Sequence, residues 1–348
     1  MLIYPKRILL GLFSRMSLIT VIALAMFTFA GCGEQKTDSE EKPFHVGLVF
    51  DVGGIGDKSF NDLAHAGLLK AKADLGVTFE YFEPTQSADR ESALRLFAQG
   101  DADLIIGVGF LFSDDILSVA TDFTNKRFVC VDYTWTEGVE VPDNLLGLKF
   151  REEEGSFMVG ALAAMVSTTG IIGFVGGMDI PLIHKFEAGY RAGAQHVNPE
   201  IEVIINYAGV TGEAFKNPTK GKELGLSQYE QGADIIFHAS GSTGLGVFEA
   251  AREKGTLAIG VDADQADEAP GLVLTSMVKQ VDVSVYQAIR EAVSGSFEGG
   301  IEVFGLKEDG VGYIQNESNA KWFTSDITAR LAQIRSEIAS GDISVPAQ

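Results

Sequence analysis

The sequence predicts an α/β fold of two doubly wound parallel-sheet lobes joined by a hinge. Three observations predict it. Short runs rich in β-branched residues alternate with helical patterns from residue 45 onward, which is typical of βαβ units. A second series of the same kind begins near residue 151, although the two series share no sequence repeat. Glycine accounts for 40 of the 348 residues, and this excess over the usual share of about 7% indicates many tight turns between strands and helices.

The first series covers residues 44–150 and opens with a strand at residues 45–51. A helix follows from about Lys58, because apolar residues there recur at the i, i+3, i+4 spacing of one buried face. The remaining elements are expected as strands at residues 78–82, 104–109, 127–133 and 145–150, with helices near 88–98 and 113–124.

The second series opens with a helix at residues 152–166. Its strands are expected at residues 171–176, 202–208, 234–239 and 257–262, with helices at about 183–196, 219–231 and 245–254. The chain then continues with a strand at 272–278, a helix to about 294, strands at 301–306 and 311–314, and a helix near 325–340. We expect about 277–298 to join the first lobe, and 151–276 with about 299–348 to form the second.

The N-terminal residues are typical of a secretion signal. Basic residues precede an apolar run at 17–30, which is shorter than a membrane-spanning helix and ends in small residues. Phe29-Ala30-Gly31-Cys32 then resembles a bacterial lipobox, with Phe29 where leucine is usual. We therefore expect residues 1–31 to be a cleaved lipoprotein signal peptide, Cys32 to carry the lipid, and 32–43 to form a flexible tether. Simple secretion and an uncleaved anchor are the alternatives.

The composition argues against several classes of protein. The chain carries 27 Lys and Arg against 48 Asp and Glu, a formal net charge of −21, and no basic run long enough to follow a phosphate backbone. Nucleic acid is therefore not an expected partner. The two cysteines, Cys32 and Cys130, are too few for a disulfide framework or a Cys-rich metal site. Cys130 lies in an apolar run, so we expect it to be a buried core residue.

The sequence lacks the patterns that carry catalysis or cofactor binding. The histidines show no metal-ligand spacing, and neither a Walker sequence nor a Gly-x-Ser-x-Gly elbow is present. Gly241-Ser-Thr-Gly-Leu-Gly246 follows a predicted strand but does not match the order of the dinucleotide fingerprint. We interpret it as a tight turn or as a backbone contact with a neutral ligand. No cofactor, no metal and no enzymatic activity are expected.

Polar and small residues stand at the carboxyl ends of predicted strands in both series. In open parallel sheets, the loops at these ends converge on one crevice. The residues in such positions are Asp51, Gly109, Phe110, Asp132, Ser240, Gly241, Asp262 and Lys279. We expect them to face a cleft between the lobes, where each carboxylate must meet hydrogen-bond donors.

The segment directly after the first strand, Asp51-Val-Gly-Gly-Ile-Gly-Asp-Lys-Ser-Phe-Asn61, closely resembles the signature of the basic membrane protein family of substrate-binding lipoproteins. Further segments resemble the family in the same order: Glu154-Gly-Ser-Phe-Met-Val-Gly160, Gly173-Phe-Val-Gly-Gly-Met178, Phe186-Glu-Ala-Gly-Tyr-Arg-Ala-Gly193, Gly260-Val-Asp-Ala-Asp-Gln265 and Leu274-Thr-Ser-Met-Val-Lys279. The resemblance implies a fold similar to the type I periplasmic binding proteins, whose two lobes close over a ligand. It also implies an ABC uptake system with permease and ATPase subunits as partners, and a lipid anchor on a bacterial membrane in the cell envelope.

Within the family, the likeness is greatest to members that bind purine nucleosides, so the implied ligands are inosine, guanosine and adenosine. The resemblance implies that Phe60 and Phe215 stack on the two faces of the base, which contributes about 1–3 kcal/mol per base with little preference among bases. Phe215 lies in a loop after a predicted strand and is hard to explain as core. Phe60 also falls on the apolar face of its helix, so a core position is the alternative for it.

The same resemblance implies that Asn61 and Asp132 read the polar edge of the base. It implies that Asp262 and Lys279 hold the ribose, since a carboxylate accepts from two vicinal hydroxyls and an ammonium donates to their oxygens. Further contacts are expected from three residues that a tight turn alone would also explain: Asp51, Phe110 and Gly241.

The charges of these residues also bear on the class of ligand. Three carboxylates against one lysine suit an uncharged nucleoside better than a nucleotide. A sugar or another small metabolite is the rival ligand, because sugars also stack on aromatic rings. A sensor without a transporter and an enzyme such as a nucleoside hydrolase are the rival functions.

Overall fold

The computed structural model describes residues 42–86, 88–136 and 138–348. The predicted signal peptide at 1–31, the predicted lipid attachment at Cys32 and nearly all of the predicted tether at 32–43 lie outside these residues. The unit that carries the fold runs from Pro43 to Gln348. Among the helices of the described residues, none combines the length and the apolar character that crossing a bilayer requires.

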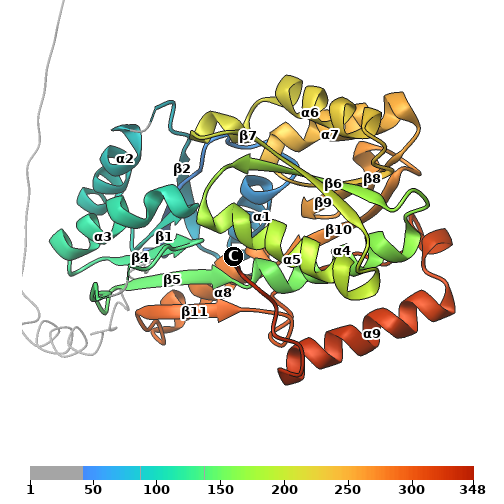
Figure 1. The fold of residues 1–348 in the computed structure, drawn as a ribbon. Helices are drawn as coiled ribbons and strands as arrows, with labels where there is room; N and C mark the ends of the chain where they lie inside the picture. The colour runs from blue at the N-terminus through green and yellow to red at the C-terminus, as the bar shows by residue number, and fades with distance from the viewer. Residues whose placement is uncertain (1–41, 87, 137) are drawn as a thin grey trace, which may run out of the picture. The chain divides into compact units, whose positions relative to one another are not determined.

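The strands of the described residues form two sheets, and the first has the order β11-β5-β4-β3-β1-β2 with parallel neighbours throughout. Its strands are β1 (His45–Val49), β2 (Thr78–Phe82), β3 (Leu104–Val108), β4 (Arg127–Val131), β5 (Leu145–Phe150) and β11 (Gly300–Phe304). One face is covered by α1 (Phe60–Leu75) and α8 (Val281–Ser294), the other by α2 (Ala88–Gln99) and α3 (Ser113–Asp122) (Figure 1). Because successive side chains of a strand point to opposite faces, Leu48 packs toward α1 and Val49 toward α2.

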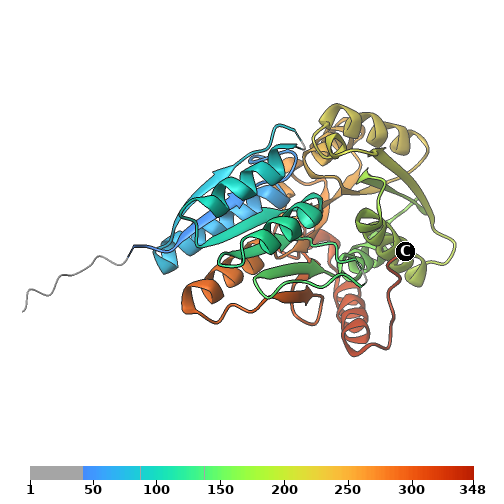
Figure 2. The same cartoon turned by 90° about the vertical axis from the view of Figure 1, so that its left-hand side faces the viewer.

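The second sheet has the order β12-β10-β9-β8-β6-β7, and β12 is antiparallel to β10 while the other pairs are parallel. Its strands are β6 (Ile171–Met178), β7 (Glu202–Gly209), β8 (Ile235–Ala239), β9 (Leu257–Asp262), β10 (Val273–Lys279) and β12 (Val311–Tyr313). Its helices are α4 (Glu152–Val166) and α5 (Pro181–Val197) on one face and α6 (Pro218–Glu230) and α7 (Gly244–Lys254) on the other, with α9 (Ser325–Ser340) against α4. Figure 2 shows the arrangement with the side of the first sheet toward the viewer. The α/β class predicted from the sequence is confirmed.

Each sheet with its helices forms one lobe, and the described chain crosses between the lobes after β5, after β10 and after β11. One assignment differs from the expectation for residues 299–348. Strand β11 pairs with β5 in the first sheet, with Gly300 opposite Leu146, and so belongs to the first lobe. Hydrophobic alternation predicts a strand but carries no information on which sheet edge the strand joins, so the sequence pattern placed this strand wrongly.

Three strands of the first sheet end earlier than predicted, β1 at Val49, β3 at Val108 and β4 at Val131. Phe50 and Gly109 still donate one backbone hydrogen bond each to a neighbouring strand. Asp51, whose N–H donates to the Asn61 side chain, and Asp132 leave the ladder. Asp132 does so with a φ of 59°, in the left-handed region that few residues other than glycine adopt. Polar side chains that the pattern counted as strand residues therefore lie in loops at the sheet's carboxyl edge.

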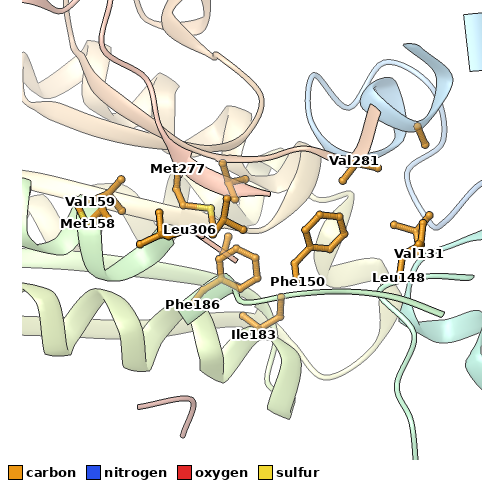
Figure 3. Packing of buried hydrophobic residues seen from close by; sticks show 14 of the residues in the cluster. Val131, Leu148, Phe150, Met158, Val159, Ile183, Phe186, Met277, Val281 and Leu306 are labelled. Atoms are coloured by element: carbon orange, nitrogen blue, oxygen red, sulfur yellow. The ribbon is translucent and has the colours of Figure 1, made fainter. Parts of the chain in front are cut away.

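Apolar side chains fill the junction where the chain crosses between the lobes. The rings of Phe150 and Phe304, at the ends of β5 and β11, stack with centroids 5.3 Å apart. Figure 3 shows Phe150, Phe186 and Val281 within one buried cluster. The crossing segments thus pack into a hydrophobic core that is continuous between the two sheets. This packing holds the neighbouring polar residues in place.

Candidate functional site

A cavity lies at the carboxyl edges of the two sheets. Its walls come from loops after β1, β3 and β4 and the start of α1 in the first lobe, and from α5 and the ends of β8, β9 and β10 in the second. The structure brings together around it all the residues proposed from the sequence as ligand contacts: Asp51, Phe60, Asn61, Phe110, Asp132, Phe215, Gly241, Asp262 and Lys279. Convergence at the carboxyl edge is the behaviour expected of doubly wound sheets.

Lys279 is the buried positive charge of the cavity, with 2% of its surface exposed. Its Nζ lies 2.6 Å from Asp132 Oδ2 and 3.3 Å from Glu152 Oε1, and Glu152 is also paired with Lys185 at 3.0 Å. Burial alone would lower the pKa of Lys279, but Asp132, Glu152 and Asp262 outweigh it and hold the pKa above its usual range. The ammonium therefore stays charged. One of its three N–H donors bonds to Asp132 Oδ2, while Glu152 is paired with it by charge, so donor capacity remains for a ligand.

Asp132 borders the cavity and has one carboxylate oxygen without a partner among the described residues. Its Oδ2 accepts from Lys279, whereas its Oδ1 is buried and has no hydrogen-bond partner among the described residues. Burial raises the pKa of Asp132 more than the adjacent Lys279 lowers it. An unpaired buried carboxylate oxygen is costly unless a donor reaches it. The geometry thus suits a ligand N–H or O–H at this point.

The loop between β1 and α1 holds Asn61 in place. Asp57 accepts hydrogen bonds from the backbone N–H groups of Ser59 and Asn61 and from Asn61 Nδ2, at 2.9, 2.8 and 2.9 Å, and so satisfies donors at the start of α1. Asn61 Oδ1 accepts from the Asp51 backbone N–H at 3.0 Å. One N–H and one lone pair of the Asn61 amide remain for a ligand.

Asp262 ends β9 in the left-handed region, with a φ of 64°, and is almost fully buried. Its Oδ2 accepts a hydrogen bond of 2.5 Å from the Ser59 hydroxyl in the other lobe. Burial raises the pKa of Asp262 to about 6, although Lys279 and the Ser59 hydrogen bond each lower it. Burial likewise raises the pKa of Asp51 to about 7. A hydrogen-bond donor on a bound ligand would lower the pKa of either carboxyl, because it stabilises the ionised form.

Aromatic rings form the apolar part of the wall. Phe60 stands at the first position of α1, and the Lys279 ammonium lies 5.0 Å from its ring centroid. Phe215 ends the short helix η2 (Gly212–Phe215), and its ring lies so close to Gly177 that a Cβ there would be 2.3 Å from Cε1. Gly241 has a φ of 54°, and a Cβ at that position would lie 3.1 Å from the Phe215 carbonyl oxygen. Glycine at both positions allows Phe215 to border the cavity.

Sequence reasoning missed several residues of the wall. They are Val52, Asp57, Leu182, Ile183, Phe186, Ala239 and Val261. Ser240, which the strand-end rule placed in the cleft, does border the cavity, whereas Gly109 from the same set is not among the lining residues. Asp57 and Phe186 lie within segments that resemble the family. Phe186 also lies on a helical face with the spacing of ordinary core, so periodicity alone did not indicate that its ring borders a cavity. In the part of the chain that the structure describes, no group of three or more His, Cys, Asp or Glu is placed to hold a metal ion.

Comparisons with known proteins agree with this geometry. Residues 44–348 match the Bmp family, described as ABC transporter substrate-binding protein PnrA-like. The chain is 34% identical to the CD4+ T-cell-stimulating antigen of Listeria monocytogenes, with 93% of this chain and 97% of that protein aligned. It is 35% identical to basic membrane protein D of Borreliella burgdorferi, with 92% and 93% aligned. A crystal structure of an ABC transporter solute-binding protein from Aeropyrum pernix superposes with a TM-score of 0.80 at 32% identity, over 88% of this chain and 94% of that one.

Proposed function

Because the chain belongs to the Bmp family of ABC transporter substrate-binding proteins, we propose that it binds purine nucleosides in the cavity between its lobes and delivers them to an ABC permease. The proposal extends the family assignment from a small-molecule ligand to a particular class of ligand. A nucleoside offers a flat base and a hydroxyl-bearing ribose, and the wall contains groups suited to each.

The observation that carries the proposal is the buried, unpartnered Oδ1 of Asp132 within the described residues. A purine N–H, on the ring of guanine or hypoxanthine or on the 6-amino group of adenine, is a donor that would satisfy this oxygen. Asn61, which also borders the cavity, has one remaining donor and one remaining acceptor. The two residues together suit a base edge that mixes N–H and C=O groups. A hydrocarbon ligand would leave the Asp132 carboxylate unsatisfied at a cost of about 1–3 kcal/mol or more.

The aromatic wall supports a planar ligand. Phe60 and Phe215 come from different lobes and both border the cavity. We propose that each ring contacts one face of the base when the lobes are closed. Such contacts tolerate different bases, which fits a receptor for inosine, guanosine and adenosine alike.

Asp262 and the free donor of Lys279 are the groups that we propose for the ribose. Two vicinal hydroxyls donate to one carboxylate, and the lysine donates to a ribose oxygen. Together with Asp51, Asp57 and Asp132, these residues make the wall predominantly acidic. A phosphate placed among them would meet like charges in a poorly hydrated space, so the proposed ligand is the nucleoside and not the nucleotide.

We further propose that the lipid on Cys32 holds the protein at the outer face of a bacterial membrane, where it would meet its permease. The proposed role is binding without a change of covalent bonds. A nucleoside is expected to leave the cavity as it entered.

The function is tested by denaturing the purified protein and identifying the released small molecules by mass spectrometry. We expect a purine nucleoside among the released molecules. It is either retained from the expressing cell or bound during incubation with an equimolar nucleoside mixture, followed by gel filtration. A sugar or another metabolite in its place would contradict the ligand class. Free base and ribose appearing in proportion to protein and time would indicate hydrolysis and contradict the binding role.

A further inference from the structure

Besides the Lys279–Asp132 pair, two residues, Ser59 and Gln265, form hydrogen bonds from one lobe to the other beside the cavity. The Ser59 hydroxyl, just before α1, donates to Asp262 Oδ2 after β9 at 2.5 Å. The Gln265 Nε2 donates to the Lys58 backbone carbonyl at 3.0 Å. Ser59 is fully buried and Gln265 is 2% exposed, so water does not compete freely for either bond.

Each partner in these bonds is held by its own lobe. In the first lobe, the Ser59 backbone N–H donates to Asp57, and Lys58 adopts a φ of 57° that turns its carbonyl group out of the helical path. In the second lobe, Gln265 Oε1 accepts from the Val261 backbone N–H at 2.8 Å and lies 3.1 Å from His238 Nε2. The two surfaces are therefore fixed separately, and only their relative position decides whether the cross-lobe bonds form.

A second, apolar contact between the lobes lies on another side of the cavity. Gly212 of η2 lies against Val52 and Leu111, because a Cβ on Gly212 would be 3.0 Å from Val52 Cγ2 and 3.5 Å from Leu111 Cδ1. This contact is small and non-directional. The hydrogen bonds of Ser59 and Gln265, together with the Lys279–Asp132 pair, are directional contacts that constrain the position of one lobe on the other.

We infer that Ser59 and Gln265 are positioning residues that hold the lobes closed over the ligand and orient Asp262 toward it. With one carboxylate oxygen engaged by Ser59, the Asp262 side chain cannot swing away from the cavity without breaking the cross-lobe bond. The inference deepens the proposed function and rests on it for the identity of the ligand. The new point concerns release. The ligand can leave only after the hydrogen bonds of Ser59 and Gln265 break, whereas binding to the open lobes requires neither bond.

Loss of either bond is therefore expected to change the dissociation rate of the ligand more than its association rate. The Ser59→Ala variant loses a hydrogen bond to a charged group, which corresponds to a dissociation rate about 10 to 100 times faster. The Gln265→Glu variant keeps the side-chain oxygen that faces Val261 but loses the N–H that donates to Lys58. We expect it to release ligand faster as well, with association rates within about threefold of the parent in both variants.

The test is stopped-flow measurement of guanosine binding to the purified full chain and these two variants. Ser284→Ala is the matched control, because the Ser284 hydroxyl is equally buried and donates only to the Val281 carbonyl one turn earlier. The control is expected to bind and release guanosine like the parent. A residue that merely stabilised the fold would lower the melting temperature without ligand and would not separate the two rate constants.

A second readout does not depend on the ligand. Spin labels at Gln86→Cys and Val210→Cys, exposed positions in different lobes, report the separation of the lobes by pulsed electron resonance. Both Ser59→Ala and Gln265→Glu are expected to shift the distance distribution to longer values than the labelled parent shows. If the parent binds no nucleoside, the proposed function fails, and this measurement still decides the inference. Parent-like distances and parent-like dissociation in whichever of the two variants folds would overturn it.

Discussion

Lys279 Nζ lies 2.6 Å from Asp132 Oδ2, although the two residues are 147 positions apart and belong to different lobes. The pair is buried, and the same ammonium reaches Glu152 where the chain first crosses between the sheets. One lysine therefore connects the cavity, the second lobe's sheet edge and a crossing segment. The cavity and the junction between the lobes share this charge cluster.

Replacing this lysine is expected to destabilise the protein and abolish binding. Lys279→Met leaves Asp132 and Glu152 with less compensation in a buried space, which typically costs about 3–5 kcal/mol. Equilibrium unfolding in urea measures the change. Lys222→Met is the control, because Lys222 pairs with Glu253 on the exposed surface and its loss is expected to leave the unfolding midpoint unchanged. A Lys279→Met variant as stable as the parent would contradict the compensating role.

The proposed ribose contact predicts a selective loss. Asp262→Ala removes the carboxylate that accepts from the ribose hydroxyls, so guanosine affinity is expected to fall about 10- to 100-fold. Guanine has no ribose, and its affinity is expected to change less than threefold. Calorimetric titration of both ligands into parent and variant provides the comparison. An equal loss for nucleoside and free base would show that Asp262 does not contact the ribose.

Binding is expected to weaken in acid. The Asp262 carboxyl has a pKa of about 6 in the folded protein, and its role as a double acceptor requires the ionised form. The guanosine Kd is therefore expected to be constant above about pH 7 and to rise as the pH falls through 6, approaching tenfold per pH unit below it. Titrations from pH 5 to 8 measure this dependence.

A second pH titration distinguishes the contribution of Asp262 to the acid dependence from that of Asp51. Burial also raises the pKa of Asp51 to about 7, so the same titration with Asp51→Asn shows which group is responsible. With Asp262 responsible, this variant keeps the acid dependence near pH 6. A parent Kd that is the same at pH 5 and pH 8 would contradict the requirement for an ionised acceptor.

The proposed stacking predicts large losses from single ring deletions. Phe215→Ala and Phe60→Ala are each expected to weaken guanosine binding by about 1–3 kcal/mol. Phe82→Ala is the control, because Phe82 is 38% exposed and lies outside the cavity wall. Calorimetry measures the affinities. If Phe60→Ala lowers the melting temperature but leaves the Kd unchanged, Phe60 is a core residue, which is the alternative that its helical face allowed.

Much of the fold was accessible from the sequence, for identifiable reasons. Strand β5 and helices α4 and α9 have the limits predicted from periodicity. In these segments the apolar residues keep the spacing of one buried face or strand from end to end. The strand-end rule and the family resemblance together led to the residues that border the cavity.

Tertiary relations were not accessible in this way. Glu152 stands in the first turn of a helix, where acidic residues are common on the surface, yet it is 1% exposed and paired with Lys279 and Lys185. The pairing of β11 and the cross-lobe bond of Ser59 likewise depend on segments distant in the chain. The spacing of apolar residues along a segment indicates which of its side chains are buried. It does not indicate which distant segment those side chains contact.

The central claim is that an uncharged purine nucleoside fills the cavity, and the thermal stability of the purified protein with matched ligands tests it most directly. Inosine, guanosine and adenosine are expected to raise the melting temperature, with a stabilisation of about 2.7 kcal/mol at a hundred times Kd. The corresponding monophosphates are expected to give little or no rise at equal concentration. Equal rises with nucleosides and monophosphates, or no rise with any of the three nucleosides, would contradict the account.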